Sequence, residues 1–257
     1  MIDIHSHILN NVDDGSKSLE NTIEILKKAE QAGFSDIVLT PHYIEGYYEN
    51  TKSLIKEKIA ELKKELYKQD IIVELHQGNE IMLTENTPKL LNESKIATIA
   101  NSRYVLFEVP LSNRMLNLEQ IAYVLKANGY IPILAHPERY AFVQEDPNEI
   151  IDIIKLGVLI QSNYGSFIGQ YGRTAKEVVE VLLENHLINF LGTDVHRHGG
   201  IFENINEILR RIRSISEDER YINEITSVNQ RKVLNDLDIY TKYPIGIRAR
   251  KKVFFFF

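Results

Sequence analysis

Nearly every short apolar run of this 257-residue sequence is followed by a histidine or carboxylate side chain, and of the histidines only His76 and His186 fall outside this pattern. His5 and His7 lie two residues apart, and Asp194 and His196 repeat that spacing much later in the chain. Side chains at positions i and i+2 of a strand point to the same side, so each pair can hold one cation. The spacing therefore predicts a metal site that begins with His5 and His7.

The other candidate ligands follow other apolar runs. Glu80 and Glu108 add carboxylates that can bridge two cations, and Asp14 adds a third carboxylate after the first run. The nine predicted ligands are His5, His7, Asp14, His42, Glu80, Glu108, His136, Asp194 and His196. Because one cation takes at most about four protein ligands, this set indicates two or three cations that share carboxylates.

Cations held close together favour hydrolysis of a phosphate ester, because they generate hydroxide and clamp the attacking and leaving oxygens. Arg139 follows a predicted ligand by three residues, and its guanidinium fork matches phosphate oxygens. The candidates for direct catalytic roles are therefore Arg139, Arg197 and His42. His198 is a further residue that could bind substrate or protonate the leaving group.

Composition limits the chemistry. The sequence has no cysteine, which excludes disulfides, thiolate nucleophiles and iron–sulfur clusters. Any cation must sit on nitrogen and oxygen ligands, which suit Mn, Mg, Fe, Co or Zn. The formal net charge of −6 does not favour a nucleic-acid partner. No run approaches the roughly 20 apolar residues of a membrane span, and no leader is visible, so we expect a cytoplasmic protein without stable membrane insertion.

Short apolar runs alternate with longer amphipathic segments, which predicts parallel strand–helix units. The predicted strands are Ile2–Ile4, Asp36–Thr40, Ile71–Leu75, Tyr104–Phe107, Ile131–Ala135, Val158–Gln161 and Asn189–Gly192. The predicted helices are Leu19–Ala32, Lys52–Lys68, Leu118–Ala127, Pro147–Leu156, Thr174–Asn185 and Ile205–Ile215. Seven strands predict a distorted α/β barrel, with an open doubly wound sheet as the alternative.

In a barrel of parallel strands the carboxyl ends meet on one face, so the predicted ligands would converge there. We expect a single domain over residues 1–257, with an irregular tail from about residue 237. The tail ends with Arg248, Arg250, Lys251 and Lys252, then Val253 and four phenylalanines. It could associate peripherally with an anionic membrane surface, but packing on the barrel or disorder is the favoured interpretation. The oligomeric state is left open.

The ordered motifs resemble those of the PHP (polymerase and histidinol phosphatase) superfamily. They are His5-Ser6-His7, Asp13-Asp14-Gly15, Thr40-Pro41-His42, Gly78-Asn79-Glu80, Phe107-Glu108, Ala135-His136-Pro137-Glu138-Arg139 and Asp194-Val195-His196. The first 15 residues, with Asn101-Ser102-Arg103-Tyr104 and the segment 129–139, are similar to one branch of that superfamily. This branch comprises the manganese-dependent protein-tyrosine phosphatases of Gram-positive capsule and exopolysaccharide clusters (CpsB/CapC-like).

The resemblance implies a distorted seven-stranded, TIM-like α/β barrel with a three-metal manganese site. It implies that one cation is held by His5, His7, Glu80 and Asp194, the second by Glu80, Glu108 and His136, and the third by Asp14, His42 and His196. Arg139 would bind the phosphoryl group. In the family, Asn and then an arginine follow the last motif, whereas Arg197 and His198 follow it here, which makes Arg197 the candidate for a second phosphate contact.

The implied substrate is phosphotyrosine, especially on the tail of a bacterial tyrosine kinase, with in-line attack by metal-held hydroxide and a role in capsule or exopolysaccharide synthesis. One alternative is a phosphoesterase of the same fold that acts on a small molecule such as histidinol phosphate. A metal-dependent amidohydrolase would be expected to place a lysine at a strand end, and none stands there. A non-catalytic binding protein would be expected to have lost ligands, but the set is complete.

Overall fold

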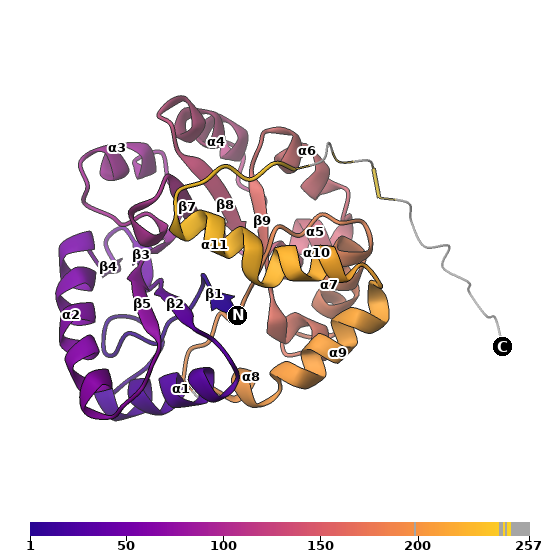
Figure 1. The fold of residues 1–257 in the computed structure, drawn as a ribbon. Coiled ribbons are helices and arrows are strands. Elements are labelled where there is room, and N and C mark those ends of the chain that lie inside the picture. Colours follow the sequence, from indigo (N-terminus) through magenta and orange to yellow (C-terminus); the bar gives the residue numbers. More distant parts are fainter. Residues whose placement is uncertain (198, 242–243, 245, 248–257) are drawn as a thin grey trace.

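In the computed structural model, which describes residues 1–197, 199–241, 244, 246 and 247, strands are enclosed by a ring of helices (Figure 1). The strands are β1 (Ile2–Asp3), β2 (Asp36–Leu39), β3 (His42–Ile44), β4 (Tyr48–Glu49), β5 (Glu74–Gln77), β6 (Glu80–Met82), β7 (Tyr104–Glu108), β8 (Ile131–Ala135), β9 (Leu159–Asn163) and β10 (Phe190–Gly192). His198 and the tail residues 248–257, to which the sequence assigned roles, lie outside the described residues.

The helices run between the strands and after the last one. They are α1 (Leu19–Gln31), α2 (Lys52–Lys68), α3 (Thr87–Asn92), α4 (Leu118–Ala127), α5 (Ala141–Glu145), α6 (Glu149–Lys155), α7 (Arg173–Glu184), α8 (Gly200–Glu203), α9 (Ile205–Ile215), α10 (Glu219–Asn223) and α11 (Asn229–Leu234). Shorter helical turns are η1 (Ile99–Asn101), η2 (Pro137–Arg139), η3 (Tyr164–Ile168) and η4 (Glu224–Val228). Among the described residues, no helix combines the length and apolar character needed to cross a bilayer.

The expected α/β class with parallel strands is confirmed, and each of the six predicted helices is present within two residues of its predicted bounds. The strand predicted at Ile71–Leu75 was placed too early, because β5 begins at Glu74. Residues 70–73 still belong to the turn that ends α2: Asp70 has a φ of 53°, and the backbone N–H of Ile71 donates to Leu66 O at 3.1 Å. Apolar composition alone did not reveal that turn.

Two chain segments change from one sheet to the other. β2 and β5 lie in a sheet of order β1-β2-β5, whereas their continuations β3 and β6 lie in a sheet of order β10-β9-β8-β7-β6-β3-β4. Thr40-Pro41 and Gly78-Asn79 are the short interruptions. Neighbouring strands pair in parallel except β3 and β4. A parallel bridge between Ser6 and Val195 links the segment after β1 to the segment after β10.

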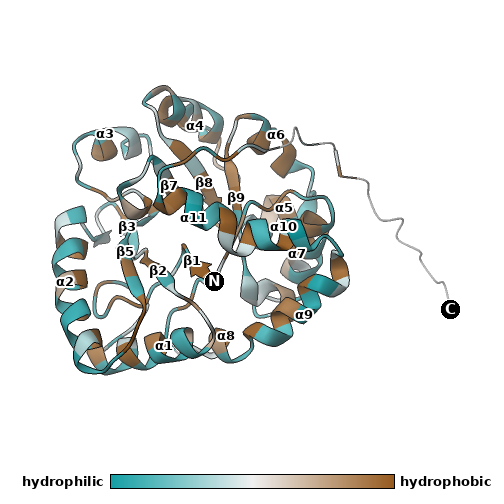
Figure 2. Cartoon of the chain, viewed as in Figure 1, coloured by the Kyte–Doolittle hydropathy of each residue, from teal (hydrophilic) through white to brown (hydrophobic). Residues whose placement is uncertain are grey.

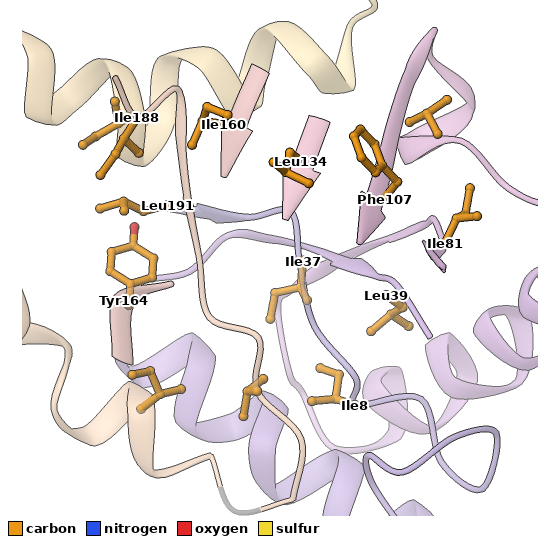
Figure 3. Packing of buried hydrophobic residues seen from close by; sticks show 14 of the residues in the cluster. Ile8, Ile37, Leu39, Ile81, Phe107, Leu134, Ile160, Tyr164, Ile188 and Leu191 are labelled. Atoms are coloured by element: carbon orange, nitrogen blue, oxygen red, sulfur yellow. The ribbon is translucent and has the colours of Figure 1, made fainter. Parts of the chain in front are cut away.

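Apolar side chains pack on both faces of the strands. Strand residues such as Phe107, Leu134 and Ile160 pack in one large buried cluster that also includes helix side chains (Figure 3). The residues of β7, β8 and β9 are mostly hydrophobic, whereas the helices mix hydrophobic and hydrophilic residues (Figure 2). A smaller second cluster includes Leu106 and Ile133, which alternate with the residues of the first, as expected for strands buried on both faces.

Helix α11 covers the amino-terminal end of the strands. Its Val233 belongs to the second cluster, and its Gln230 Nε2 donates to Leu191 O at 3.3 Å. Arg231 forms two hydrogen bonds with the Asp36 carboxylate of β2, at 3.2 and 2.9 Å. Further on, Leu237 O accepts from the hydroxyl of Tyr104 at 2.6 Å. The C-terminal segment thus closes the end of the strands opposite the predicted ligands.

We expect Ile133→Ala to lower the free energy of unfolding by about 2–5 kcal/mol, because Ile133 is fully buried and its truncation leaves a cavity. Ile72→Ala is the matched control, since Ile72 is 84% exposed and should change stability by less than about 0.5 kcal/mol. Urea denaturation of both variants measures the difference. Equal effects would contradict a packed interior between the strands.

Candidate metal centre

The nine predicted ligands gather at the carboxyl ends of the strands. His5 and His7 follow β1, Glu80 follows β5 at the break where β6 begins, Glu108 ends β7, and Asp194 lies just after β10. Asp14, His42, His136 and His196 lie beside them. Segments separated by most of the chain therefore supply one site, as the strand-end pattern predicted.

The first group of ligand atoms is completely buried. His5, His7, Glu80 and Asp194 each offer an atom within 4.8 Å of the others, which is the set that the family resemblance implied for one cation. The Nε2 atoms of His5 and His7 lie 3.1 Å apart. Their common direction follows from the i, i+2 spacing on extended backbone.

The Glu80 carboxylate lies at the centre of the imidazoles. Its Oε2 is 3.3 Å from His5 Nε2, 3.1 Å from His7 Nε2 and 3.0 Å from His42 Nδ1. Its Oε1 is 2.8 Å from His136 Nε2. Burial raises the pKa of Glu80, but the surrounding histidines, His5 foremost, outweigh burial and hold that pKa well below its usual value.

Two further groups share residues with the first. His7, Asp14, His42 and His196 form one, and His42, Glu80 and Glu108 form the other. In the latter, His42 takes the place that the resemblance gave to His136, because His42 Nδ1 is 3.1 Å from Glu108 Oε1 whereas His136 contacts the opposite oxygen of Glu80. His42 thus faces two groups at once, and His136 closes the cluster from its far side.

Unpaired buried atoms in the cluster indicate that its donor set fits divalent cations. Glu80 Oε2, His42 Nδ1 and Asp14 Oδ1 are buried yet make no hydrogen bond, although opposite partners stand within 3.0–3.5 Å. Buried polar atoms are normally paired, so these three unpaired atoms, all from the candidate ligand groups, need another partner. Imidazole nitrogens and carboxylate oxygens are ligands for Mn, Fe, Co and Zn.

The imidazoles compensate the charge of the carboxylates. Burial and His7 both lower the pKa of His42, but the nearby Glu108 and Glu80 carboxylates raise it to about 10. Burial likewise lowers the pKa of His7, but Asp13 and Glu80 raise it well above its usual value. Because a histidine must lose its proton before it binds a cation, cation binding would compete with these protons.

Two candidate ligands have backbone conformations that are rare for residues other than glycine. The φ angle is 35° at His136 and 50° at Asp194. Such left-handed residues cost roughly 1–3 kcal/mol each and are concentrated at functional sites. His136 follows β8 directly and Asp194 lies two residues after β10, so both unusual conformations occur where a strand has just ended beside the cluster.

Partners that the sequence did not reveal orient the ligands. Asp13 Oδ2 accepts from His7 Nδ1 at 2.9 Å and from the His42 backbone N–H at 3.0 Å. Gln161 Oε1 lies 2.7 Å from His5 Nδ1. The loop that carries Asp13 fits tightly, because a Cβ at Gly15 would lie 1.8 Å from the carbonyl oxygen of His7. The Asp-Asp-Gly motif could have indicated these roles of Asp13 and Gly15, and the position of Gln161 at the end of the predicted strand Val158–Gln161 could have indicated that it reaches the site.

Arg139 is held beside the cluster by two residues. Its Nη1 donates to Asp194 Oδ2 at 2.8 Å, and its guanidinium lies 4.5 Å from the centre of the Tyr171 ring. The same Oδ2 accepts from Asn163 Nδ2 at 2.7 Å and from the Tyr171 hydroxyl at 3.2 Å. Three donors thus occupy Oδ2 and leave Oδ1 to face His5 and His7. The sequence predicted Arg139 but not Asn163 or Tyr171.

Arg197 lies at the edge of the site. Its Nε donates to Asp14 O at 2.9 Å, and its own carbonyl accepts from Asn21. With Arg139 and His196 it lines a hollow of about 510 Å³ on one side of the cluster. A second hollow, of about 440 Å³, opens over His42, Glu108 and Arg139. A contact of Arg197 with phosphate stays a prediction.

The fold and this cluster define an α/β protein whose parallel strands carry candidate ligands for several cations at their carboxyl ends. Residues 1–235 match the family model for capsular polysaccharide synthesis, CpsB/CapC. The chain therefore belongs to the CpsB/CapC family, which confirms the resemblance seen in its motifs.

Named relatives support this membership. CapC of Staphylococcus aureus is 32% identical over 256 residues, 99% of each chain. The tyrosine-protein phosphatase YwqE of Bacillus subtilis strain 168 is 34% identical over 196 residues, which is 76% of this chain and 77% of the relative. The chain is also similar to a crystal structure from a set that comprises YwqE of Bacillus subtilis and CpsB of Streptococcus pneumoniae, "unique metal-dependent tyrosine phosphatases". The two structures superpose with a TM-score of 0.90 at 29% identity, over 97% of this chain and 100% of the other.

We expect Asp13→Asn to weaken cation binding about 10- to 100-fold, the usual effect of removing a residue that orients a ligand. An amide cannot accept all three hydrogen bonds that the carboxylate takes from His7, His42 and Gly15. Isothermal titration of the cation-free protein with Mn²⁺ measures the change. Asp152→Asn is the control, because Asp152 is exposed on α6. Equal affinities in the two variants would contradict the role of Asp13.

Proposed function

We propose that this protein is a metal-dependent protein-tyrosine phosphatase that acts in capsule or exopolysaccharide synthesis. The observation that carries the proposal is the cluster of imidazoles and carboxylates around Glu80, with Arg139 at its edge. Such a donor set suits hydrolysis, and the arginine suits a phosphoryl group. Relatives over most of the chain are named tyrosine-protein phosphatases, which supports phosphotyrosine as the substrate.

The candidate ligands would hold two or three cations, which we propose to be manganese in the cell. Divalent cations in such a site supply a water of lowered pKa and neutralise negative charge on the phosphoryl oxygens. His5, His7, Glu80 and Asp194 would hold the most buried cation. Glu80, Glu108, His136 and His42, together with Asp14 and His196, would hold the others.

Arg139 would bind the phosphoryl oxygens. The Tyr171 ring and the Asp194 carboxylate hold its guanidinium in place before substrate arrives, so little side-chain entropy is lost on binding. His42 lines the same hollow as Arg139 and would take part in the reaction as ligand and neighbour of the phosphoryl group. A tyrosinate with a pKa of about 10 leaves more readily than an alkoxide, so protonation of the leaving group need not dominate.

Several finer features belong to the same proposal. We propose that the two sheets form one distorted seven-stranded barrel, which the Ser6–Val195 bridge supports because it joins the first and last strand segments. We propose that residues 1–257 form one domain, that the protein works in the cytoplasm, and that its partner is a phosphotyrosine protein such as a bacterial tyrosine kinase. Arg197 is proposed as a second phosphate contact because it lines the hollow beside Arg139.

Removal of cations by chelation should abolish turnover of a phosphotyrosine peptide, and Mn²⁺ should restore it. Each of Mn²⁺, Mg²⁺, Co²⁺, Fe²⁺ and Zn²⁺ is added back singly, and phosphate release is measured. Histidinol phosphate, assayed in parallel, should be hydrolysed much more slowly. If no cation restores turnover the proposal fails, and if histidinol phosphate is preferred the substrate is a small molecule instead.

Arg139→Gln should lower kcat/KM for the phosphotyrosine peptide about 10²- to 10³-fold, the usual loss when one donor to the developing charge is removed. Mn²⁺ affinity, measured by titration, is the check that the ligand cluster survives the substitution. Arg173→Gln is the matched control, because the Arg173 side chain is 91% exposed on α7. Retention of full activity by Arg139→Gln would exclude a role in phosphate binding.

A further inference from the structure

The 440 Å³ hollow over the candidate ligands is lined by two chemically different groups of side chains. Glu80, Glu108, His136 and Arg139 belong to its polar part. Asp14, His42, Asp194 and His196 also belong to the polar part, and the apolar and aromatic part comes from three segments at neighbouring strands. These residues are Ile44, Tyr47, Tyr48, Met82, Val109 and Leu111. A ligand that fits both parts has an anionic head and an apolar body.

The aromatic part belongs to the hairpin of β3 and β4. In its antiparallel register Ile44 pairs with Tyr48, and the Tyr47 N–H donates to Ile44 O at 2.9 Å across the turn. Gly46 has a φ of 77°, which the tight turn requires. The hairpin starts at the candidate ligand His42, so one short segment carries both a ligand and the tyrosines.

The two tyrosines have a defined position relative to that ligand. The Tyr48 ring lies nearly parallel to the His42 imidazole, with centroids 6.1 Å apart and an interplanar angle of 12°. The Tyr47 ring meets the Tyr48 ring edge to face at 4.4 Å and 62°. The pair therefore forms an aromatic wall that begins beside the ligand cluster and extends outward.

Contacts on the far side of the hairpin hold the wall in place. Asn50 Nδ2 donates to His42 O at 2.9 Å and to Val12 O at 3.0 Å. At the turn, Glu45 accepts from Asn86 Nδ2 at 3.1 Å. Despite this anchoring, Tyr47 leaves 72% of its surface exposed. An anchored but exposed ring beside a hollow is ready to bind, whereas exposure alone would mean little.

We propose that Tyr47 and Tyr48 form the subsite for the phenyl ring of a phosphotyrosyl side chain and select aryl over alkyl phosphates. The inference rests on the proposed phosphatase function and adds what recognises the leaving group. With the phosphoryl group at Arg139 and the candidate ligands, the ring of the substrate lies against the tyrosine wall. Aromatic rings favour edge-to-face and offset contacts, which this wall offers and a small alkyl group cannot use.

The test compares two non-hydrolysable ligands that share one head group. Phenylphosphonate and methylphosphonate are titrated into the Mn²⁺-loaded protein by calorimetry. Tyr47→Ala should weaken phenylphosphonate about ten-fold and leave methylphosphonate within about two-fold, because only the phenyl group reaches the wall. Tyr47→Phe should bind both ligands like the unchanged protein. Tyr123→Ala is the matched control, since Tyr123 is also 72% exposed but lies on α4 and outside the hollow.

Tyr48→Leu should also reduce the preference for phenylphosphonate over methylphosphonate. Because the Tyr48 ring lies beside the His42 ring, the Mn²⁺ affinity of this variant is measured separately. If Tyr47→Ala leaves phenylphosphonate binding unchanged, or weakens both phosphonates equally, the subsite is overturned. If the unchanged protein prefers phenylphosphonate through Tyr47 yet does not hydrolyse a phosphotyrosine peptide, the aryl subsite stands and the proposed function fails.

Discussion

The burial of the Glu80 carboxylate among four imidazoles is the constraint on which the rest of the site depends. Glu80 has no exposed surface, and His5, His7, His42 and His136 surround its two oxygens at 2.8–3.3 Å. Removing one partner of a buried charge costs about 3–5 kcal/mol, so these side chains must be positioned together. The Gly78-Asn79 break between β5 and β6 places Glu80, because β6 begins at Glu80 itself.

The strand-end pattern was sufficient to predict the candidate ligands, because parallel strands bring their carboxyl ends to one face whatever the details of the sheet. The helices were predictable for a similar reason: their apolar spacing, as in α2, matches the helical period. The breaks between β2 and β3 and between β5 and β6 were not predictable from the sequence. Thr40-Pro41 and Gly78-Asn79 are short, and backbone bonds from Gly78 to Leu39 and from Glu80 to Thr40 continue the pairing across them.

The residues that orient the ligands were missed for a different reason. Gln161 ends the predicted strand Val158–Gln161 but is an amide, not one of the ligand types that the strand-end pattern selected, and Tyr171 lies in the loop before α7. Their roles depend on which atoms meet across strands, such as Gln161 Oε1 with His5 Nδ1. Asp13 was predictable only in part. Its motif indicated that the loop belongs to the site, but only the structure shows that Asp13 orients His7 whereas Asp14 faces His42 and His196.

The bridge between Ser6 and Val195 bears on the order in which the site forms as the protein folds. Asp194 N donates to His5 O, and His7 N donates to Val195 O, so the early and late ligand segments are neighbours in one backbone ladder. Contacts between residues so distant in sequence form late, because a long loop must close first. Because Asp194 follows His5 and His7 by well over 100 residues, translation supplies the two histidines long before the aspartate. The buried group of four candidate ligands is therefore complete only when the segment after β10 has paired with the segment after β1.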